Sequence, residues 1–489
     1  MIDFKEEKEF REQIAMFINY VKRTYKRDEL LIFWIDTFCG AGGTSTGIHF
    51  SNITNMFVAA CVNHDQVAID SHAANHPHTL HFTEDIRDFK VVFKLKMFVE
   101  ELRKFFPECL INFWASLECI NFSRAKGGLP RDADSRSLAE HMEMYLEALK
   151  PDYFYVENVR EFMSWGPLDE NGKPVSKTAG TDYVRWVDEI KSLGFNYDKR
   201  ILNAADFGSY QSRERLFIQF SRIGLPISWP DQTHSKKPDK NSLFPLQKRK
   251  PVRDILDLKD KGNCIFAKVK SDKTYKRILE GAKKEINKEV HFLTSYYGNG
   301  GSHSIGDSCN TLTTKDRFAL HYMQYDYSKL TTSSVDSSAN TVTTTPKHNL
   351  MCLDWLMDTQ FGRTAKSLDE SCFTVIARLD KKPIYLLQTE RGYPKDFIKE
   401  SDSEIVKELK EFMILNGIQK IYIRMLKIAE LKKIQGFPEN YILTGNQTQQ
   451  KKHIGNAVDV WQAKAIIREN YNSILRKRIK SKSKVMQYE

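Results

Sequence analysis

Cys119 lies where a short apolar segment gives way to a basic loop. Residues 110–114 are mostly apolar, which predicts a buried strand, and the loop 124–131 contains two glycines, one proline and three cationic residues. A thiol at the carboxyl end of such a strand is well placed to act as a nucleophile in an open α/β sheet. A lone cysteine beside an apolar strand is, however, also a common small buried residue. Other residues of the chain must decide between these two interpretations.

Glu157 and two arginines offer charged groups for the same chemistry. An apolar strand that begins at Tyr153 is expected to carry Glu157 to its carboxyl end, where the residue could serve a site or act only as a helix cap or ion-pair partner. Arg213 and Arg215 occupy alternate positions at the start of another expected strand. Both arginines should therefore point to one face of the sheet.

A glycine-rich turn follows the first expected strand. The segment 30–35 is continuously apolar, as in a parallel strand buried on both faces, and Asp36 is expected to end it. Gly40 and Gly42 would let the backbone approach a bound ligand closely. The pattern is not the dinucleotide fingerprint, because Ser45 occupies the third glycine position, and it is not a phosphate-binding P-loop, because no Gly-Lys-Ser/Thr follows. The turn predicts a nucleoside-type cofactor over the sheet edge or, more simply, a tight strand-to-helix turn without a ligand.

A second strand is predicted over 56–62, and it ends at Asn63. About 20 residues past a glycine-rich loop is where a Rossmann-like fold places a ribose-binding side chain. Residues 82–86 close another short element with an acidic residue. Four histidines between these segments have spacings that match no standard metal motif, so we expect them on the surface. They are His72, His76, His78 and His81.

Length and charge restrict the class of protein. With 489 residues, the chain is long enough for two or three domains and a substantial core. The formal net charge of +11 favours an acidic partner, with nucleic acid first. Eight cysteines without a CxxC pair indicate neither a zinc site nor a disulfide framework, and reduced thiols are typical of the cytoplasm. The charged N-terminus and the lack of a long apolar run predict neither a signal peptide nor a membrane span.

The sequence is expected to divide into three segments. Residues 1–258 alternate strands and helices behind an amphipathic N-terminal helix within residues 1–30. Residues 259–415 change to lysines, serines, threonines and short strand patterns, with a weak repeat of about 30 residues that predicts a small, mostly β module. From 416 to 489 the α/β character returns.

Two helices are expected in the last segment. One covers 424–435 and stops at Gly436, and the other covers 459–475. The residues that follow, 476–484, form a basic run that is expected to be a flexible, solvated end with nonspecific phosphate contacts.

Taken in order, these segments resemble the motifs of the DNA cytosine-5 methyltransferase family. Six stretches match: 36–43 for the S-adenosylmethionine loop, Cys119 for the catalytic thiol, 157–159 for the Glu-Asn-Val motif, 211–215 for the Gln-x-Arg-x-Arg motif, 431–438 for the helix that supports the recognition domain, and 455–458 for the last cofactor motif. Six matches in the family's order make chance a poor explanation.

The resemblance implies an α/β, Rossmann-like S-adenosylmethionine-dependent methyltransferase fold with a smaller, mostly β target-recognition domain. It also implies a reaction in which Cys119 adds to C6 of a flipped-out cytosine, so that C5 can take the methyl group of S-adenosylmethionine. In this scheme Glu157 holds N3 of the base. Arg215 bonds O2 and orients Glu157, and Arg213 positions the catalytic loop or a phosphate. No metal is needed.

The resemblance also assigns binding residues and partners. The residues expected to hold the cofactor are Phe38, Gly40, Gly42, Asn63, Asp85, Ile86 and Asn456. Arg124 and Lys126 of the basic loop are expected to contact DNA. Independently of the resemblance, Arg317, which follows the first of the weak repeats, is expected to bind either a guanine edge or a phosphate. The implied partners are double-stranded DNA and S-adenosylmethionine. The resemblance further implies a monomeric, cytoplasmic enzyme of the restriction–modification or orphan modification type. A cognate restriction endonuclease would act as a separate protein.

Two positions depart from the family pattern. Where the family has Pro-Cys-Gln, this chain has Glu118, Cys119 and Ile120, and the charge of Glu118 is expected to raise the pKa of the thiol. Where the family places a glutamate on the cofactor ribose, this chain has Asn63, whose amide can still bond hydroxyls but without charge assistance. Two other interpretations therefore stay open. They are a tRNA cytosine-5 methyltransferase, whose recognition region tends to be smaller, and a catalytically impaired DNA-binding relative.

Overall fold

The computed structural model describes most of the chain. The described residues are 3–117, 138–167, 176, 179–239, 241–286, 291–295, 302–304, 318–322, 354–359, 365–392 and 398–485. Glu118, Cys119, Ile120, Arg124, Lys126 and Arg317 lie outside these ranges, so their roles stay predictions. Over the described ranges, no helix combines the length and the apolar character that crossing a lipid bilayer requires.

The chain forms two compact units. The first contains residues 1–256, 369–381 and 427–489, and the second contains 257–368 and 382–426. The sequence placed 369–381 with the middle segment, but the backbone of this stretch is bonded to the first unit. Cys372 N–H donates to the Tyr210 carbonyl at 2.6 Å, and Val252 N–H donates to the Glu370 carbonyl at 2.9 Å.

The first unit is built on a seven-stranded sheet with the order β3-β2-β1-β4-β5-β7-β6. The strands are β1 Ile32–Thr37, β2 Met56–Val62, β3 Leu80–Phe82, β4 Leu110–Ser116, β5 Tyr153–Asn158, β6 Phe195–Asn203 and β7 Glu214–Arg222. The five neighbouring strands β3, β2, β1, β4 and β5 are parallel to one another. Strand β7 runs antiparallel to both of its neighbours, β5 and β6. The carboxyl ends of the five parallel strands therefore share one edge, where an open α/β sheet binds its ligands.

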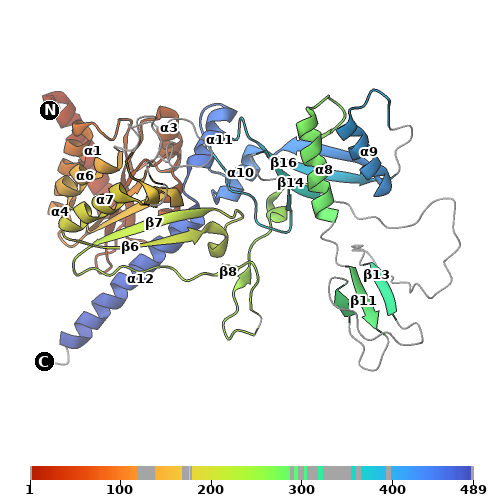
Figure 1. Ribbon diagram of the computed structural model, residues 1–489. Helices are drawn as coiled ribbons and strands as arrows, with labels where there is room; N and C mark the ends of the chain where they lie inside the picture. Colours follow the sequence, from red (N-terminus) through yellow and green to blue (C-terminus); the bar gives the residue numbers. More distant parts are fainter. Residues whose placement is uncertain are drawn as a thin grey trace. The chain divides into compact units, whose positions relative to one another are not determined.

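Helices cover both faces of this sheet (Figure 1). Because β1 is apolar from Ile32 to Ile35, its alternate residues serve two cores: Phe33 and Ile35 face one, and Ile32 and Trp34 the other. The first core also takes residues from α1 Phe4–Thr24, α4 Phe89–Phe105, α6 Met142–Leu149 and α7 Thr181–Ser192, and the second from α2 Gly43–Phe50 and α12 Val460–Val485. The other helices of this unit are α3 Gln66–Asn75, α10 Ile428–Gln435 and α11 Gln447–Asn456, with short 3₁₀ helices η2 Arg160–Ser164, η3 Ala204–Phe207 and η4 Val252–Ile255 and the short strands β8 His234–Ser235 and β9 Gln247–Lys248.

The described part of the second unit contains a five-stranded sheet with the order β10-β17-β16-β14-β15 and a three-stranded sheet β12-β11-β13. The sequence predicted short strands here, and the structure adds two helices, α8 Asp272–Ile286 and α9 Glu404–Leu415. Their apolar sides share a core with the larger sheet through Leu279, Leu409 and Trp355. The strands are β10 Asn263–Cys264, β11 His291–Ser295, β12 Ser302–Ser304, β13 Phe318–Tyr322, β14 Asp354–Asp358, β15 Lys366–Ser367, β16 Ile384–Arg391 and β17 Ile418–Met425.

Three local predictions are wrong. Asp36 does not end the first strand but lies buried inside β1. The helix expected over 424–435 begins only at Ile428, because the chain is still paired in β17 up to Met425. The basic run 476–484 is not a flexible end but continues α12. Arg476 bonds Glu469 within this helix, and Lys477 bonds the Gly224 carbonyl outside it.

Candidate active site

The turn between β1 and α2 has an unusual backbone. Phe38, Gly40 and Gly42 all have positive φ angles, of 57°, 51° and 98°. The left-handed conformation is easy for glycine, but at Phe38 it costs about 1 kcal/mol, and such strain is concentrated at functional sites. Tyr441 holds the turn from outside, since its hydroxyl donates to the Ala41 carbonyl at 2.5 Å. The predicted cofactor loop is therefore a rigid, strained turn.

Two glycines let the last predicted cofactor motif and the start of α12 pack directly on α2. A Cβ added at Gly43 would lie 2.9 Å from the Val458 nitrogen, and one added at Gly47 would lie 2.6 Å from Ala463 Cβ. Both separations are shorter than real contacts allow. The motif 455–458 therefore meets the glycine-rich turn in space, as the resemblance implies, although the two are far apart in sequence.

The other predicted cofactor residues follow the neighbouring strands. Asn63 comes directly after β2, and its side-chain oxygen accepts the Asp65 N–H at 2.9 Å. The amide NH₂ of Asn63 is thus the part suited to a ribose hydroxyl. Ile86 is buried, and its carbonyl accepts the Tyr145 hydroxyl at 2.6 Å. Asn456 is exposed at the end of α11.

Asp85 already has a partner that the sequence did not predict. Arg87 binds both carboxylate oxygens, with Nε 3.0 Å from Oδ1 and Nη2 2.6 Å from Oδ2. The Arg87 hydrogen bonds lower the pKa of Asp85 to about 2, although burial acts in the opposite direction. Asp85 is therefore ionised, and an adenine amino group would have to share it with Arg87.

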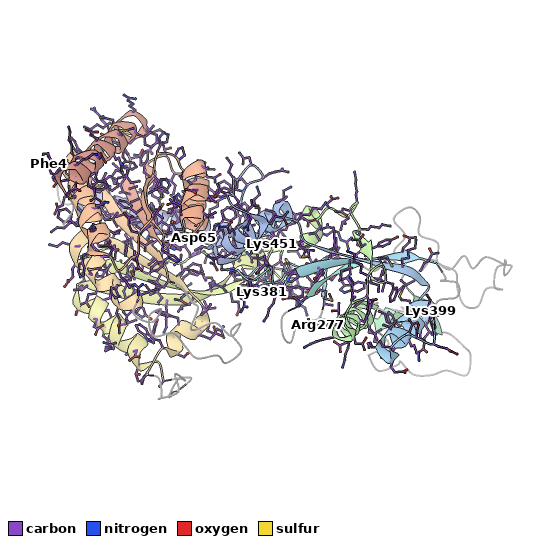
Figure 2. All side chains as sticks on the ribbon, turned by 90° about the horizontal axis from the view of Figure 1, so that it is seen from above. Phe4, Asp65, Arg277, Lys381, Lys399 and Lys451 are labelled. Carbon is purple, nitrogen blue, oxygen red and sulfur yellow. The ribbon has the colours of Figure 1, made fainter. Side chains whose placement is uncertain are left out.

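Asp65 joins α3 to α11 beside this edge. It caps α3 by accepting the Val67 N–H at 3.1 Å, and its other oxygen lies 2.9 Å from Lys452 Nζ and 3.2 Å from His453 Nε2. Figure 2 labels Asp65 and Lys451, the neighbour of Lys452 in sequence. Partial burial alone would raise the pKa of Asp65, but the hydrogen bonds from Lys452 and His453 outweigh it and hold that pKa well below its usual range.

Asp65→Asn is expected to lower the free energy of unfolding by about 0.5–1 kcal/mol near pH 7, because asparagine keeps the cap but loses a partly screened ion pair. Since the folded-state pKa is depressed, this contribution is present above the unfolded pKa of about 4 and is lost as the pH falls through the folded-state value. Urea denaturation at pH 7 and pH 3 measures it. Asp70→Asn, on the exposed side of the same helix, is the control. The assignment of a stabilising ion pair to Asp65 would be contradicted if both variants lost the same free energy of unfolding. It would also be contradicted if the loss in Asp65→Asn did not change with pH.

Glu157 lies buried at the carboxyl edge of the sheet, next to the strand that leads to Cys119. It pairs with Ser116 in the β4–β5 register, and the described chain stops at Leu117, two residues before Cys119. Arg215 Nε is 3.1 Å from Glu157 Oε1, an ion pair in which the N–H does not align as a hydrogen bond. Among the described residues, Glu157 Oε1 is thus a buried acceptor without an aligned donor. Such a group can receive a donor from a substrate.

Arg213 binds two backbone carbonyl groups inside the first unit. It does not share a target with Arg215: its buried guanidinium donates through Nη1 to the Val375 carbonyl at 2.9 Å and to the Gly455 carbonyl at 3.2 Å. Arg213 therefore ties residues 369–381 and the last cofactor motif to the start of β7. Its predicted contact with the catalytic loop or a phosphate stays untested.

Gln211 is a structural residue whose importance the sequence did not reveal. Its Nε2 donates to Gln435 Oε1 at 2.8 Å and to Asp459 Oδ2 at 2.9 Å, and its Oε1 accepts the Val375 N–H at 3.1 Å. Burial raises the pKa of Asp459, although hydrogen bonds from Ser209 and Gln211 oppose the shift. The only signal in the sequence was its place as the first residue of the Gln-x-Arg-x-Arg stretch.

The histidines between β2 and β3 are not all on the surface, as the sequence predicted. His72 is fully buried, with Nε2 2.9 Å from Ser45 Oγ and Nδ1 3.0 Å from His81 Nε2. His76 and His81 are half-buried, and His78 is exposed and stacked on Tyr20. The helical spacing of α3 turns His72 inward, which the sequence spacing alone did not show.

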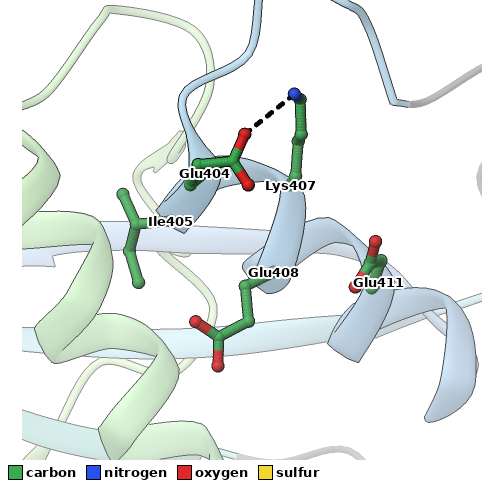
Figure 3. A pocket seen from close by; sticks show the side chains of 5 residues that line it. All are labelled: Glu404, Ile405, Lys407, Glu408 and Glu411. Carbon is green, nitrogen blue, oxygen red and sulfur yellow. Dashed lines mark hydrogen bonds and ion pairs between the residues drawn. The ribbon is translucent and has the colours of Figure 1, made fainter.

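A hollow of about 480 Å³ on the surface of α9, in the second unit, is lined by Glu404, Ile405, Lys407, Glu408 and Glu411 (Figure 3). Lys407 Nζ pairs with Glu404 Oε1 at 3.0 Å, which leaves the lining with an excess of carboxylates. A negatively charged surface repels phosphates. The hollow contains none of the predicted site residues and does not suit DNA.

The sequence model for C-5 cytosine-specific DNA methylases matches residues 32–472, so the chain belongs to this family. The protein is a DNA (cytosine-5-)-methyltransferase that uses S-adenosylmethionine as methyl donor.

Its relatives include Type II methyltransferases. M.SacI of Streptomyces achromogenes is 22% identical over 455 residues, which cover 89% of this chain and 91% of that protein. M.AquIA of Picosynechococcus sp. is 29% identical over 229 residues, which cover 46% of this chain and 86% of that protein. Among solved structures, a DNMT2 mutant of Spodoptera frugiperda matches with 14% identity and a TM-score of 0.48, over 90% of this chain and 99% of that chain.

Proposed function

We propose that the carboxyl edge of the seven-stranded sheet is the methyl-transfer site and that Cys119 attacks C6 of a flipped-out cytosine there. The observation that carries this proposal is the position of Glu157. One oxygen of its buried carboxylate has no aligned hydrogen-bond donor among the described residues. Glu157 also pairs with Ser116 of β4, the strand that leads to Cys119. The strained turn at Phe38 and the open amide of Asn63 fit a nucleoside-type ligand on the same edge.

The residues then have distinct tasks. C5 of cytosine is a poor nucleophile, and addition of the Cys119 thiolate to C6 makes it enamine-like. Glu157 would hold N3 and favour its protonated form as the C6–S bond forms, while Arg215 orients Glu157 and bonds O2. Bound S-adenosylmethionine supplies an electrophilic sulfonium methyl group. A base, which can be water, then removes the C5 proton, and the thiolate leaves as the C6–S bond breaks.

We assign DNA contacts to both parts of the chain. The target base must leave the duplex stack, at a cost of a few kcal/mol. The basic loop that carries Arg124 and Lys126 would close on the flipped nucleotide. The second unit would read the sequence, with Arg317 on a base edge or a phosphate. The net charge of +11 supports binding to DNA in general, but not to a particular sequence.

We further propose that the protein is a modification enzyme of a restriction–modification system or an orphan of that type. The Type II methyltransferases among its relatives support this proposal. A cognate restriction endonuclease would act as a separate protein, and the methyltransferase would work as a cytoplasmic monomer.

Expression in bacteria that lack cytosine methylation tests the function. Bisulfite sequencing of the host DNA should show 5-methylcytosine at one short motif. Bisulfite sequencing of the tRNA from the same cells should stay unchanged. Methylation of the tRNA alone, or of neither nucleic acid, would reject the DNA substrate.

Glu157→Gln is expected to lower kcat by about 10²-fold or more, because glutamine cannot stabilise the protonated N3 as a carboxylate does. The fold should be unchanged, since the amide is isosteric with the carboxylate. Transfer of labelled methyl groups to duplex DNA measures the rate. Glu214→Gln, an exposed carboxylate on β7, is the matched control. A rate within a few-fold of wild type for Glu157→Gln would remove this residue from the reaction.

A further inference from the structure

A row of metal-binding side chains crosses the buried sheet face beneath the predicted cofactor loop. Asp36 pairs with Cys61 in the β1–β2 register, and Cys61 pairs with His81 in the β2–β3 register, so the three side chains share one face. Cys39 follows β1 directly, and His72 comes from α3, which packs against β3. Residues from four elements therefore meet at one point.

The row is buried inside the first unit. Asp36, Cys61 and His72 are 0% exposed, and Cys39 is 5% exposed. Burying several polar groups together costs free energy unless they bind one another or a common ligand. No step of the proposed methyl transfer uses these groups.

Hydrogen bonds orient the His72 ring. The Ser45 hydroxyl donates to Asp36 Oδ2 at 2.9 Å, so it can accept from His72 Nε2, also at 2.9 Å. This arrangement places the proton of a neutral His72 on Nε2 and leaves a lone pair on Nδ1. Nδ1 faces His81 Nε2 at 3.0 Å. Metal-binding histidines are held by the same kind of hydrogen bond on the nitrogen that does not bind the metal.

We propose that Cys39, Cys61, His72 and His81 form a structural zinc site. The ligand atoms of Cys39, Cys61 and His72 all lie within 4.8 Å of one another. In a tetrahedral zinc site, such atoms are separated by about 3.5–3.8 Å, and two histidine nitrogens by about 3.3 Å. His81 Nε2 lies 3.0 Å from His72 Nδ1, and the half-buried His81 ring would supply the fourth ligand. Two thiolates with two imidazoles are a donor set that zinc prefers.

The electrostatics of the pair of cysteines agree with this geometry. Burial acts to raise the pKa of Cys61, but the hydrogen bond from Cys39 and the charge and hydrogen bonds of His72 and His81 outweigh it, and the pKa of Cys61 lies well below the ordinary value. Burial and the neighbouring Cys61 thiolate raise the pKa of Cys39 well above it. A divalent cation at this point would favour the thiolate form of both cysteines.

The site would tie the cofactor turn to the sheet. Cys39 lies between Phe38 and Gly40, so a metal bond to its sulfur would help to hold the strained backbone on either side. Zinc here would be structural, and the methyl-transfer chemistry does not pass through it. The inference is independent of the roles proposed for Cys119 and Glu157.

Metal content and spectroscopy test the proposal on the full-length protein. Purified under reducing conditions without a polyhistidine tag, it should contain about one zinc per chain by plasma mass spectrometry. Replacement of zinc by Co²⁺ should give thiolate-to-cobalt charge-transfer absorption and the intense visible bands of a tetrahedral site. Cys61→Ser should lose both signals, whereas Cys109→Ser, a buried cysteine of the apolar core outside the row, should keep them.

A second variant covers the case in which Cys61→Ser does not fold. His81→Gln removes one half-buried ligand, and its affinity for zinc in competition with a chromophoric chelator should fall by about 10-fold or more. Three results would overturn the proposal. They are wild-type protein with neither zinc nor a cobalt–thiolate band, an intact mass that shows a Cys39–Cys61 disulfide in protein from a reducing cytosol, and full zinc retention by a folded Cys61→Ser or His81→Gln variant.

Discussion

Replacement of Cys119 by serine should abolish methyl transfer, with a loss of about 10⁴-fold or more in rate. A serine hydroxyl is not ionised near neutral pH and adds poorly to C6, whereas a thiolate is both available and strongly nucleophilic. Binding of duplex DNA should persist, because serine is close in size to cysteine and the cationic residues of the protein are unchanged. Incorporation of labelled methyl groups and a DNA-binding titration on the same preparation measure the two properties separately.

A mechanism-based substrate makes this prediction sharper. Wild-type protein and duplex DNA with 5-fluorocytosine at the target should form an adduct that survives denaturation, because fluorine cannot leave as the C5 proton does. Cys119→Ser should form none. Cys264→Ser, a half-exposed cysteine of the second unit, should behave as wild type. Near-normal turnover by Cys119→Ser, or an adduct lost in the Cys264 variant instead, would show that another residue is the nucleophile.

Gly455→Ala should destabilise the protein by about 3 kcal/mol or more. An added Cβ would overlap the carbonyl group of Ile376 and the nitrogen of Ala377, which are backbone atoms that cannot rotate away. Moving them apart would also disturb Arg213, which bonds the carbonyls of both Val375 and Gly455. Unpaired buried carbonyls add their own cost. Thermal and denaturant unfolding of the purified variant give the change in stability.

Gly224→Ala separates steric overlap from the general cost of losing a glycine. Gly224 has a φ of 96°, but a Cβ there meets open space, so only backbone strain of about 1 kcal/mol is expected. Equal destabilisation by the two variants would mean that the contact between 455 and 376–377 is not tightly packed. A larger effect at Gly224 would contradict the packing argument altogether.

The sequence by itself determined the order of the motifs along the chain and the chemistry to look for. The run 56–62 was predicted as a strand and is one, because a short apolar run bounded by turn residues is a local signal. The same logic placed Glu157 at the end of its strand, where it is buried. The amphipathic helix predicted within residues 1–30 is likewise present as α1, with one buried face that includes Phe10, Ile14, Phe17 and Val21.

Only the tertiary structure decided which distant groups meet. Gln211 bonds Val375 and Gln435, which lie 164 and 224 positions further along the chain. The Arg213 guanidinium bonds the carbonyls of Val375 and Gly455. His72 was predicted on the surface, but α3 carries it against β3 and buries it beside Cys61. Periodicity reports which face of an element is apolar, whereas hydrogen-bond partners depend on how separate elements pack, which no local pattern encodes.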